Sequence, residues 1–553
     1  VGPRTRAMDN VLDRCKEQLV GWYDSIDRLR VGGVLRGLQQ AGAVVNFMKR
    51  IYPGEERPLR HFSELTERLA AGVERLVRQG IPYLEAGRVS DPAVQAWLEP
   101  LYAARPRAGS LVAIVRTIEG VSSFSCRPRK HPTAPGDPKT GRRPAQTAEH
   151  HLTRGRHNIC VYYFFVFDAH WGRASVRVAS YLPFEVTLQL NGHDYLERQR
   201  HRQRRAITMA ANAVAHVADW PALRTLAATD REPAVRRFGA YWLARLPHSL
   251  TAPQLALLGG YYWYLQVLEV SHNFVFRAPD ACRPLFETLL QHNQLLGSPD
   301  TIRYLFGLSR RSRRPTSSQG TLGTPMGCFK AFYGSNWLKC YDKLGGILRF
   351  ELVINLATDF VATKSLSNLH TLTRMGQAVC KRLERTCLTA VSCPVRTGAY
   401  QALVEPGTHA SGRRYPAIRP ERPGQQALLA TMFSLAHCAT RFSNRELRAK
   451  HQQQHGIAVT SAQASYRLRT LRAHGLIEPV PRRRRYHLSR TGRPIVAFLI
   501  KLYRHLLAPV VQAASDGIHQ FRTAVVHDPI ADALQALLFA LGIAQPLPLP
   551  KRP

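Results

Sequence analysis

Apolar and charged positions alternate along the N-terminal part of the chain in a way that predicts one helix and one strand. Between residues 62 and 76, apolar residues recur every three or four positions and charged residues fill the gaps. This spacing places the apolar side chains on one face of a helix, so we expect that face to be buried. Residues 111–118 (LVAIVRTI) are apolar and β-branched, which predicts a buried strand. We therefore expect residues 1–126 to form an α/β domain.

Three strand-like runs follow a basic, Pro- and Gly-rich linker at residues 127–145. They are ICVYYFFVFD (159–168), ASVRVASY (174–181) and FEVTLQL (184–190). Connections this short join antiparallel neighbours, and Asn191-Gly192 is typical of a tight turn. The pattern predicts a β-meander over residues 146–205.

The rest of the chain up to residue 404 shows weaker periodicity. Residues 206–320 are expected to be mainly helical, with an aromatic run at residues 261–264. Residues 321–404 are expected to form an α+β segment with strands around 337–340 and 346–354. Together these patterns predict a multidomain α+β protein with a central antiparallel sheet and helices.

A Pro- and Gly-rich stretch at residues 405–424 precedes a module with a more specific pattern. An apolar helix at 425–438 is followed by Ser443-x-x-Glu446, a capping box that opens a second helix. A third helix runs from Thr460 to His474, and Gly475 is a helix-stop residue. Two short strands around an arginine loop and a last helix complete an order that resembles the winged helix-turn-helix of bacterial regulators. We expect this module over residues 425–510, and a helix and tail over 511–553.

The third helix and the arginine loop are the expected nucleic-acid contacts of this module. Ala464, Leu468 and Leu471 share the inward face, so the opposite side chains would meet base edges in the major groove. Consecutive arginines in the loop suit phosphate or minor-groove contacts. The expected binding residues are Tyr466, Arg469, Thr470 and Arg472 in the helix, and Arg482, Arg483, Arg484 and Arg485 in the loop. Such modules also bind proteins or RNA, and both remain alternatives.

The overall charge favours a polyanionic partner. The 77 Lys and Arg residues exceed the 38 Asp and Glu residues, which gives a formal net charge of +39. Nucleic acid is the commonest partner of so basic a protein, although an arginine-rich composition alone would also raise the charge. Further basic clusters that we expect to bind nucleic acid are Arg202, Arg204 and Arg205, and Arg310, Arg311, Arg313 and Arg314. DNA is the favoured partner and RNA the alternative.

Other features narrow the class of protein. No apolar run reaches about 18 residues, so neither a membrane-spanning helix nor a membrane partner is expected. The ten cysteines are scattered and form no CxxC pair, which is typical of reduced thiols. We expect a cytoplasmic bacterial protein associated with the nucleoid.

The segment NWLKCYDKLGGILRFELVINLATDF at residues 336–360 resembles a block found in an uncharacterised bacterial family that also ends in a winged helix. The block has the pattern K-x-YDK-x-G-x-LR-[FI]-E and is similar to strand pairs of plasmid and phage replication initiators. Residues 165–196 and 261–276 resemble the same family, in which an acid stands at the position of Asn273. The resemblance implies a role in replication, recombination or mobile elements.

The sequence offers one candidate for strand-cleaving chemistry. None of the 22 histidines lies two positions from another, so the His-pair metal site of rolling-circle nickases is missing. Carboxylates that bind Mg²⁺ or Mn²⁺ are the other solution, and Asp168, Glu269 and Glu351 are the candidate metal ligands and catalytic residues. They qualify only if the fold brings them together; otherwise each acid pairs with a neighbour. The alternatives to a nuclease are a non-enzymatic DNA-binding regulator and an RNA-binding protein of a ribonucleoprotein.

Overall fold

The computed structural model describes most of the chain between residues 18 and 503. The described ranges are 18–55, 58–128, 150–278, 282–283, 286, 305–306, 316–321, 328–343, 346–360, 362–391, 403–408, 412–419, 422–438, 442–481, 484–489 and 491–503. Most of the expected linker at 127–145 and all of the expected helix and tail at 511–553 lie outside these residues.

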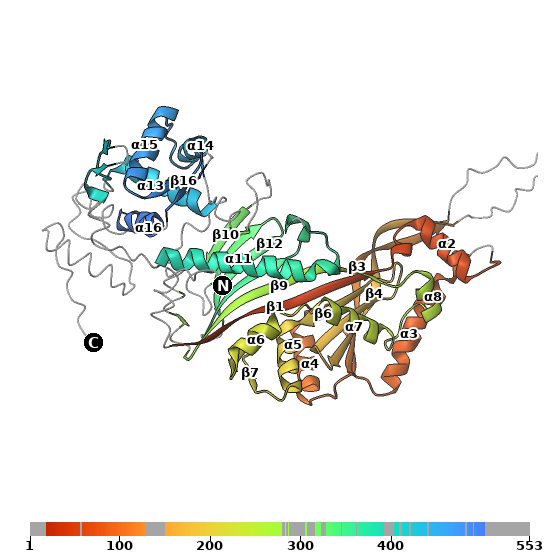
Figure 1. Ribbon diagram of the computed structural model, residues 1–553. Coiled ribbons are helices and arrows are strands. Elements are labelled where there is room, and N and C mark those ends of the chain that lie inside the picture. Colours follow the sequence, from red (N-terminus) through yellow and green to blue (C-terminus); the bar gives the residue numbers. More distant parts are fainter. Residues whose placement is uncertain are drawn as a thin grey trace, which may run out of the picture.

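A single sheet of eleven strands forms the centre of the molecule (Figure 1). Its neighbours are antiparallel except for the parallel pair β2 and β3, so the structure confirms an α+β fold with a large central sheet. In spatial order the strands are β10 (Thr316–Thr321), β11 (Cys328–Tyr333), β12 (Asn336–Lys343), β13 (Ile347–Ile354), β9 (Tyr262–Phe276), β1 (Leu19–Val34), β6 (Val186–Asn191), β5 (Gly172–Ala179), β4 (His150–Asp168), β3 (Ser110–Pro128) and β2 (Tyr83–Glu85).

Most of the helices pack around the sheet. The last four helices form a separate group near the C-terminal end of the described chain. None of the helices described is both long and apolar enough to cross a membrane. The helices are α2 (Ala41–Ile51), α3 (Phe62–Arg78), α4 (Pro92–Ala103), α5 (Gly192–Arg202), α6 (Trp220–Ala227), α7 (Glu232–Leu243), α8 (Ala252–Leu257), α11 (Leu369–Val391), α13 (Pro423–Cys438), α14 (Asn444–His455), α15 (Ser461–Ala473) and α16 (Gly492–Leu502).

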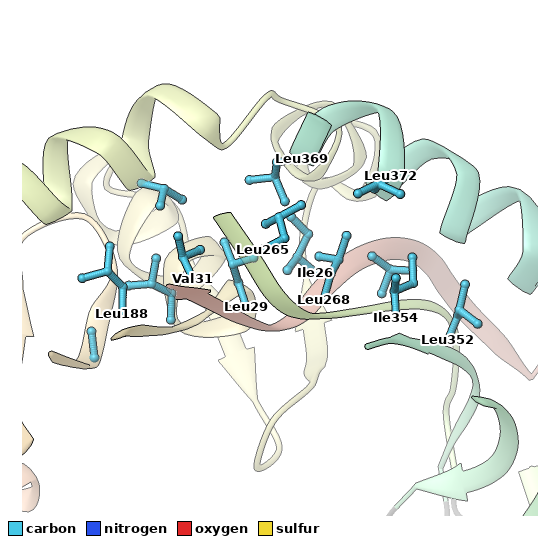
Figure 2. Packing of buried hydrophobic residues seen from close by; sticks show 14 of the residues in the cluster. Ile26, Leu29, Val31, Leu188, Leu265, Leu268, Leu352, Ile354, Leu369 and Leu372 are labelled. Atoms are coloured by element: carbon cyan, nitrogen blue, oxygen red, sulfur yellow. The ribbon is translucent and has the colours of Figure 1, made fainter. Parts of the chain in front are cut away.

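The main core lies between one face of the sheet and α11. Figure 2 shows the side chains of Leu268, Leu352 and Ile354 on the face that α11 covers with Leu369 and Leu372. Alternate residues of a strand point to opposite faces, so the other residues of β9 and β13 point away from α11. The polar residues of these two strands are therefore collected mainly on the second face.

Several elements agree with the sequence prediction. The amphipathic stretch at 62–76 lies within α3, and Leu65, Leu69 and Val73 on its apolar face are buried. The predicted meander is present as β4, β5 and β6, which are antiparallel neighbours. The predicted strand pair at 337–354 is present as β12 and β13.

The predicted segments of the central part of the chain share one sheet. The segments 1–126, 146–205, 206–320 and 321–404 all contribute strands to the same sheet, because β1 pairs with both β6 and β9. The segment 206–320 is also less helical than predicted, since the aromatic run opens the 15-residue strand β9. Pairing between strands so distant in sequence leaves no local signal.

The predicted turn at Asn191-Gly192 is a helix start instead. The Asn191 side chain accepts hydrogen bonds from the backbone N–H groups of His193 and Asp194, at 2.8 and 3.4 Å. Asn191 is thus the N-cap of α5, and Gly192 is its first residue. Asparagine is favoured both in turns and at N-caps, so the dipeptide alone does not separate the two.

The C-terminal helices have a hydrophobic core of their own, which includes Leu429, Met432 and Leu468. Capping boxes begin α14 at Ser443 and α15 at Thr460. The strands β16 (Ile477–Pro479) and β17 (Tyr486–Leu488) pair after α15, and Phe442 bridges to Tyr486 on the other side of β17. The helices and strands therefore occur in the order that the sequence predicted.

The stretch before α13 packs against this group. It contains the short strands β14 (Gly407–Thr408) and β15 (Arg414–Tyr415), and Tyr415 is buried. The ring of His474, at the end of α15, lies 2.9 Å from the backbone oxygen of Pro416. This stretch is therefore part of the C-terminal structure as well as a connection.

Candidate functional site

The sheet face that points away from α11 carries an unusual number of charged residues. On β13, Arg349 and Glu351 point to this face, and Lys339, Tyr341 and Lys343 alternate along the neighbouring strand β12. All five side chains line one cavity of about 590 Å³. The cavity is open to solvent and extends to residues of β1, α4, β5, β6, α5 and β9, so strands and helices from both halves of the sheet line it.

An irregularity in β1 adds two more charged side chains to the same cavity. The pairing of β1 with β9 shifts its register between Ile26 and Arg28, which leaves Asp27 as an extra residue. Such a bulge changes the direction of a side chain within a strand. As a result, the consecutive residues Asp27 and Arg28 both line the cavity.

Asp27 and Arg349 form a buried ion pair at the base of the cavity. The Arg349 guanidinium lies 3.2 Å from Asp27 Oδ2 and donates to Asn273 Oδ1 at 2.7 Å. The Ser271 hydroxyl donates to Asp27 Oδ1 at 2.6 Å. Burial raises the pKa of Asp27 to about 7, and the nearby carboxylate of Glu351 adds to this rise while Arg349 opposes it.

Glu351 is held by two donors from β12. Lys339 Nζ donates to Oε1 at 2.6 Å and Tyr341 Oη donates to Oε2 at 2.7 Å. Burial alone would raise the pKa of Glu351, but Lys339 and the two hydrogen bonds keep this pKa below its ordinary value. Burial raises the pKa of Tyr341, and the charge of Glu351 adds to the rise. Tyr341 therefore stays a protonated donor to Glu351.

A neutral histidine lies beside Asp27 on the α5 side. His193 Nδ1 lies 3.4 Å from Asp27 Oδ1, and its Nε2 lies 3.0 Å from Tyr23 Oη. His193 is fully buried, and burial together with the charge of Arg349 lowers its pKa well below the ordinary value. The His193 ring is therefore uncharged at neutral pH, and Arg349 is the cation that compensates Asp27.

The structure brings together two of the three predicted metal ligands. Glu269 and Glu351 line the same cavity from the adjacent strands β9 and β13. Asp168 does not line it and has a different role at the end of β4. Its Oδ1 accepts from the backbone N–H groups of His170 and Trp171 at 2.8 and 2.9 Å, and its Oδ2 accepts from the Trp242 indole at 2.9 Å. Asp168 therefore caps a turn and anchors α7.

The carboxylates in the cavity do not fit a divalent metal ion. Among the residues that the structure describes, no three His, Cys, Asp or Glu side chains are placed to hold a metal. Glu269 pairs with Arg28, and the oxygens of Glu351 are occupied by Lys339 and Tyr341. The side-chain oxygen of Asn273 accepts from Arg349. Mg²⁺ or Mn²⁺ would have to displace these donors, so we derive no chemical step through either ion.

Asp27 is one of the cavity residues that the sequence analysis missed, as are Lys343 and Arg349. Asp27 lies in the middle of a long strand, where acidic residues are rare, in a chain with few acids. An acidic residue in the middle of a strand is the sequence signal that could have identified Asp27. Its orientation depends on the bulge, which only the pairing with β9 reveals.

The predicted recognition residues lie on the exposed side of α15. Tyr466 is 45% exposed, and Arg469 and Arg472 are exposed, whereas Ala464, Leu468 and Leu471 are buried. The Tyr466 ring lies 6.1 Å from that of Tyr415. Thr470 is half-buried and its hydroxyl donates to the backbone oxygen of Tyr466 at 3.2 Å, so it is the least available of the four.

The arginines of the loop between β16 and β17 differ from one another. Arg484 and Arg485 are exposed, and Arg482 and Arg483 lie outside the described residues. Arg485 lies 3.1 Å from Glu446 Oε1, and Glu446 is the acid of the α14 capping box. Arg485 is therefore tied to α14.

The other predicted basic clusters lie only partly within the described residues. Arg202, Arg204 and Arg205 are exposed at the end of α5, where Arg205 pairs with Asp219 at 3.2 Å and Arg202 lies 3.0 Å from the His170 ring. Arg310, Arg311, Arg313 and Arg314 lie outside the described residues.

Comparison of the chain with protein-family models, curated proteins and solved structures finds no match. The cavity in the sheet and the exposed face of α15 therefore have to be interpreted from their own chemistry.

Proposed function

We propose that the chain binds DNA, and that α13–α16 together with β16 and β17 form a winged helix-turn-helix that makes the contact. The observation that supports this most is the division of α15 into two faces. Its apolar residues pack into the C-terminal core, while Tyr466, Arg469 and Arg472 remain exposed next to a basic loop. A chain with a net charge of +39 supplies the long-range attraction to phosphates.

The exposed face of α15 has the chemistry for reading bases. Arginine donates two hydrogen bonds to guanine in the major groove, and Arg469 lies opposite the buried face of the helix. Within the described residues, the Arg469 Nε donates a hydrogen bond only to the backbone oxygen of Ser465 on its own helix, at 3.3 Å, so little has to be broken for it to reach a base. Tyr466 lies one turn earlier on the same face.

The loop between β16 and β17 supplies phosphate contacts in this proposal. The pair between Arg485 and Glu446 fixes the base of the loop against α14. Arg484 is exposed and is available for the DNA backbone. Arg482 and Arg483 lie outside the described residues, and we expect from the sequence that they contribute to the same contact. In this arrangement α15 provides selectivity and the loop provides salt-dependent affinity.

The biological setting follows from the same proposal. Binding to the bacterial chromosome or to a mobile element, in replication or recombination, suits a basic protein with a sequence-reading module. Strand cleavage is not part of the proposal, because cations and a tyrosine occupy the carboxylates of Glu269 and Glu351.

RNA binding is the second candidate. One observation favours it: Tyr466 lies beside Tyr415, and the Arg413 guanidinium lies 5.8 Å from the Tyr415 ring centre. Aromatic rings next to arginine stack on unpaired bases. Tyr415 is buried, however, so only Tyr466 offers an open ring.

The test is a fluorescence anisotropy titration of the full chain with duplex DNA, single-stranded DNA and RNA at several salt concentrations. Arg469→Ala combined with Arg472→Ala should weaken binding to the preferred duplex by about 1–3 kcal/mol for each base that the variant no longer reads. Lys49→Ala combined with Arg50→Ala, which removes two exposed basic residues on α2, is the matched control and should bind like the wild type.

Tyr466→Ala and Arg469→Ala separate base reading from phosphate binding. Each should reduce discrimination between the preferred site and random DNA, with little change in the affinity for random DNA. Unchanged duplex affinity in the Arg469 and Arg472 double variant would disprove the contact through α15. Tighter binding to RNA than to duplex DNA would favour the second candidate.

A further inference from the structure

Two cations in the sheet cavity donate to the same neutral oxygen. Lys343 Nζ and Arg349 Nη2 each lie 2.8 Å from the backbone oxygen of Asn212. Two positive groups that share one carbonyl repel each other, and the carbonyl carries no charge to compensate either of them. This corner of the cavity therefore has the chemistry of an anion site.

Lys343 differs from the other cations of the cavity in its partners. Within the described residues, no carboxylate lies within ion-pair distance of Lys343. Each of the others has an acid: the pairs are Arg28 with Glu269, Lys339 with Glu351, Arg349 with Asp27, and Arg173 with Glu99. Among these five cations, Lys343 is thus the one without a direct carboxylate partner, although Asp27 and Glu351 lie near enough to favour its charge.

The environment of Lys343 disfavours the charged form of its side chain. Burial lowers the pKa of Lys343 to about 8, and the positive charge of Arg349 adds to the shift. A bound anion would reverse both effects, because it replaces lost hydration with an opposite charge. Lys343 therefore gains more from a negatively charged ligand than a solvated lysine would.

The rest of the cavity wall suits an organic ligand. Its volume of about 590 Å³ lies within the range of small-molecule and cofactor sites. Neutral polar groups of Gln189, Asn191 and Ser175 line the wall near β5 and β6, and the Asn191 amide donates to Asn212 Oδ1 at 2.8 Å. Asn191 is already engaged as the N-cap of α5, so the amide of Gln189 and the hydroxyl of Ser175 are the groups that can bind a sugar or a base.

We propose that this cavity binds the phosphate of a nucleotide, with Lys343 contacting a phosphate oxygen. Lysine binds phosphate as a point charge. Arg349 stays bound to Asp27, Asn273 and the Asn212 carbonyl and adds only its positive charge nearby. None of the cavity residues belongs to the C-terminal helices, so the proposal does not depend on DNA binding by α15.

The acids of the cavity limit the kind of phosphate ligand. Five acidic side chains line the cavity together with five basic ones. A long polyphosphate or a continuous DNA backbone would bring further negative charges close to Glu269 and Glu351. A single phosphate avoids this repulsion, so the ligand is a nucleoside monophosphate, either free or at the 5′ end of a DNA strand.

The experiment is calorimetric titration of the full chain with deoxyadenosine 5′-monophosphate, with deoxyadenosine and inorganic phosphate as comparisons. Lys343→Met keeps most of the aliphatic side chain and removes the charge, and it should weaken nucleotide binding at least about tenfold. Lys49→Met removes an exposed lysine on α2, so it matches the change in net charge and should bind like the wild type.

Lys343→Arg and the thermal melting temperature show whether a loss of binding results from a folding defect. Lys343→Arg keeps the charge and should retain binding within a few-fold, whereas loss of binding with an unchanged melting temperature in Lys343→Met assigns the effect to the site. Absence of binding by the wild type, equal binding of deoxyadenosine and the nucleotide, or equal affinity of Lys343→Met and the wild type would each overturn the proposal.

Competition then identifies the source of the phosphate. A short 5′-phosphorylated oligonucleotide that displaces the nucleotide, when its 5′-hydroxyl counterpart does not, identifies a strand end as the ligand. If neither oligonucleotide competes, the ligand is a free nucleotide. The Arg469→Ala and Arg472→Ala variant should bind the nucleotide normally, so failure of this proposal is distinguishable from failure of DNA binding by α15.

Discussion

Replacing Arg349 with methionine tests how strongly the buried ion pair supports the sheet. Arg349 is 1% exposed and its guanidinium serves Asp27, Asn273 and the backbone oxygen of Asn212. Methionine fills a similar space but leaves all three acceptors without this donor. Removing one partner of a buried pair costs about 3–5 kcal/mol, so we expect the unfolding free energy to fall by that amount near neutral pH.

The loss should also depend on pH, because Asp27 titrates. The pKa of Asp27 is raised from 3.8 to about 7 in the fold, so between these pH values the folded chain holds a proton that the unfolded chain has released. The contribution of Asp27 to stability therefore falls as pH rises through this window, and it levels off above about pH 7.

Without Arg349, the group that opposes this shift is gone and the pKa of Asp27 rises further. The difference between variant and wild type should then grow by about 1.4 kcal/mol per pH unit above pH 7, until Asp27 ionises in the variant too.

Urea unfolding followed by tryptophan fluorescence measures this effect in the right part of the molecule. All seven tryptophans lie between Trp22 and Trp337, so the signal reports the sheet and not the C-terminal helices. Arg28→Met is the matched control: its side chain is 62% exposed, so the loss should stay below about 1 kcal/mol. A loss below about 1 kcal/mol for Arg349→Met, or an equal loss at pH 6 and pH 9, would refute the reasoning.

Two further predictions concern the basic loop and the packing of α11. Replacing Arg482–Arg485 by alanine should make the slope of log affinity against log salt shallower by about three units rather than four, because Arg485 is tied to Glu446; an unchanged slope would exclude the loop from the contact. Gly376→Ala would place a Cβ 2.4 Å from Val270, so thermal unfolding should show a destabilisation of about 1–3 kcal/mol. Gly42→Ala on α2 meets open space and should not destabilise; equal effects of the two would contradict the close packing of α11.

Local patterns predicted the elements that depend on neighbouring residues. The capping box at Ser443 is visible in four consecutive residues and is present in the structure. The third helix was predicted to begin at Thr460, which is the N-cap of α15. The apolar spacing of α3 is likewise a property of a short stretch of chain. Such signals can be recognised in the sequence without knowing what the element packs against.

The candidate cavity could be predicted only in part, because it depends on contacts between distant segments. Glu269 and Glu351 were identified as candidates from their positions in strand-like surroundings, and they do line one cavity. Asp168 was chosen for the same reason, yet it binds its own turn and Trp242. Asp27 reaches the cavity because β1 forms a bulge where it pairs with β9. The paired residues of β9 lie about 240 residues further along the chain. Only the folded sheet distinguishes these cases.

The central place of β1 has a consequence for the folding of the growing chain on the ribosome. Both sheet neighbours of β1 are synthesised much later: about 150 residues separate β1 from β6, and about 230 separate it from β9. At 5–20 residues per second, roughly ten to fifty seconds pass between the synthesis of β1 and that of β9. During this time Leu29 and Val31, both fully buried in the finished sheet, lack the partner that will cover them. Nascent chains that stop between residues 34 and 262 should therefore be the ones that bind chaperones most strongly.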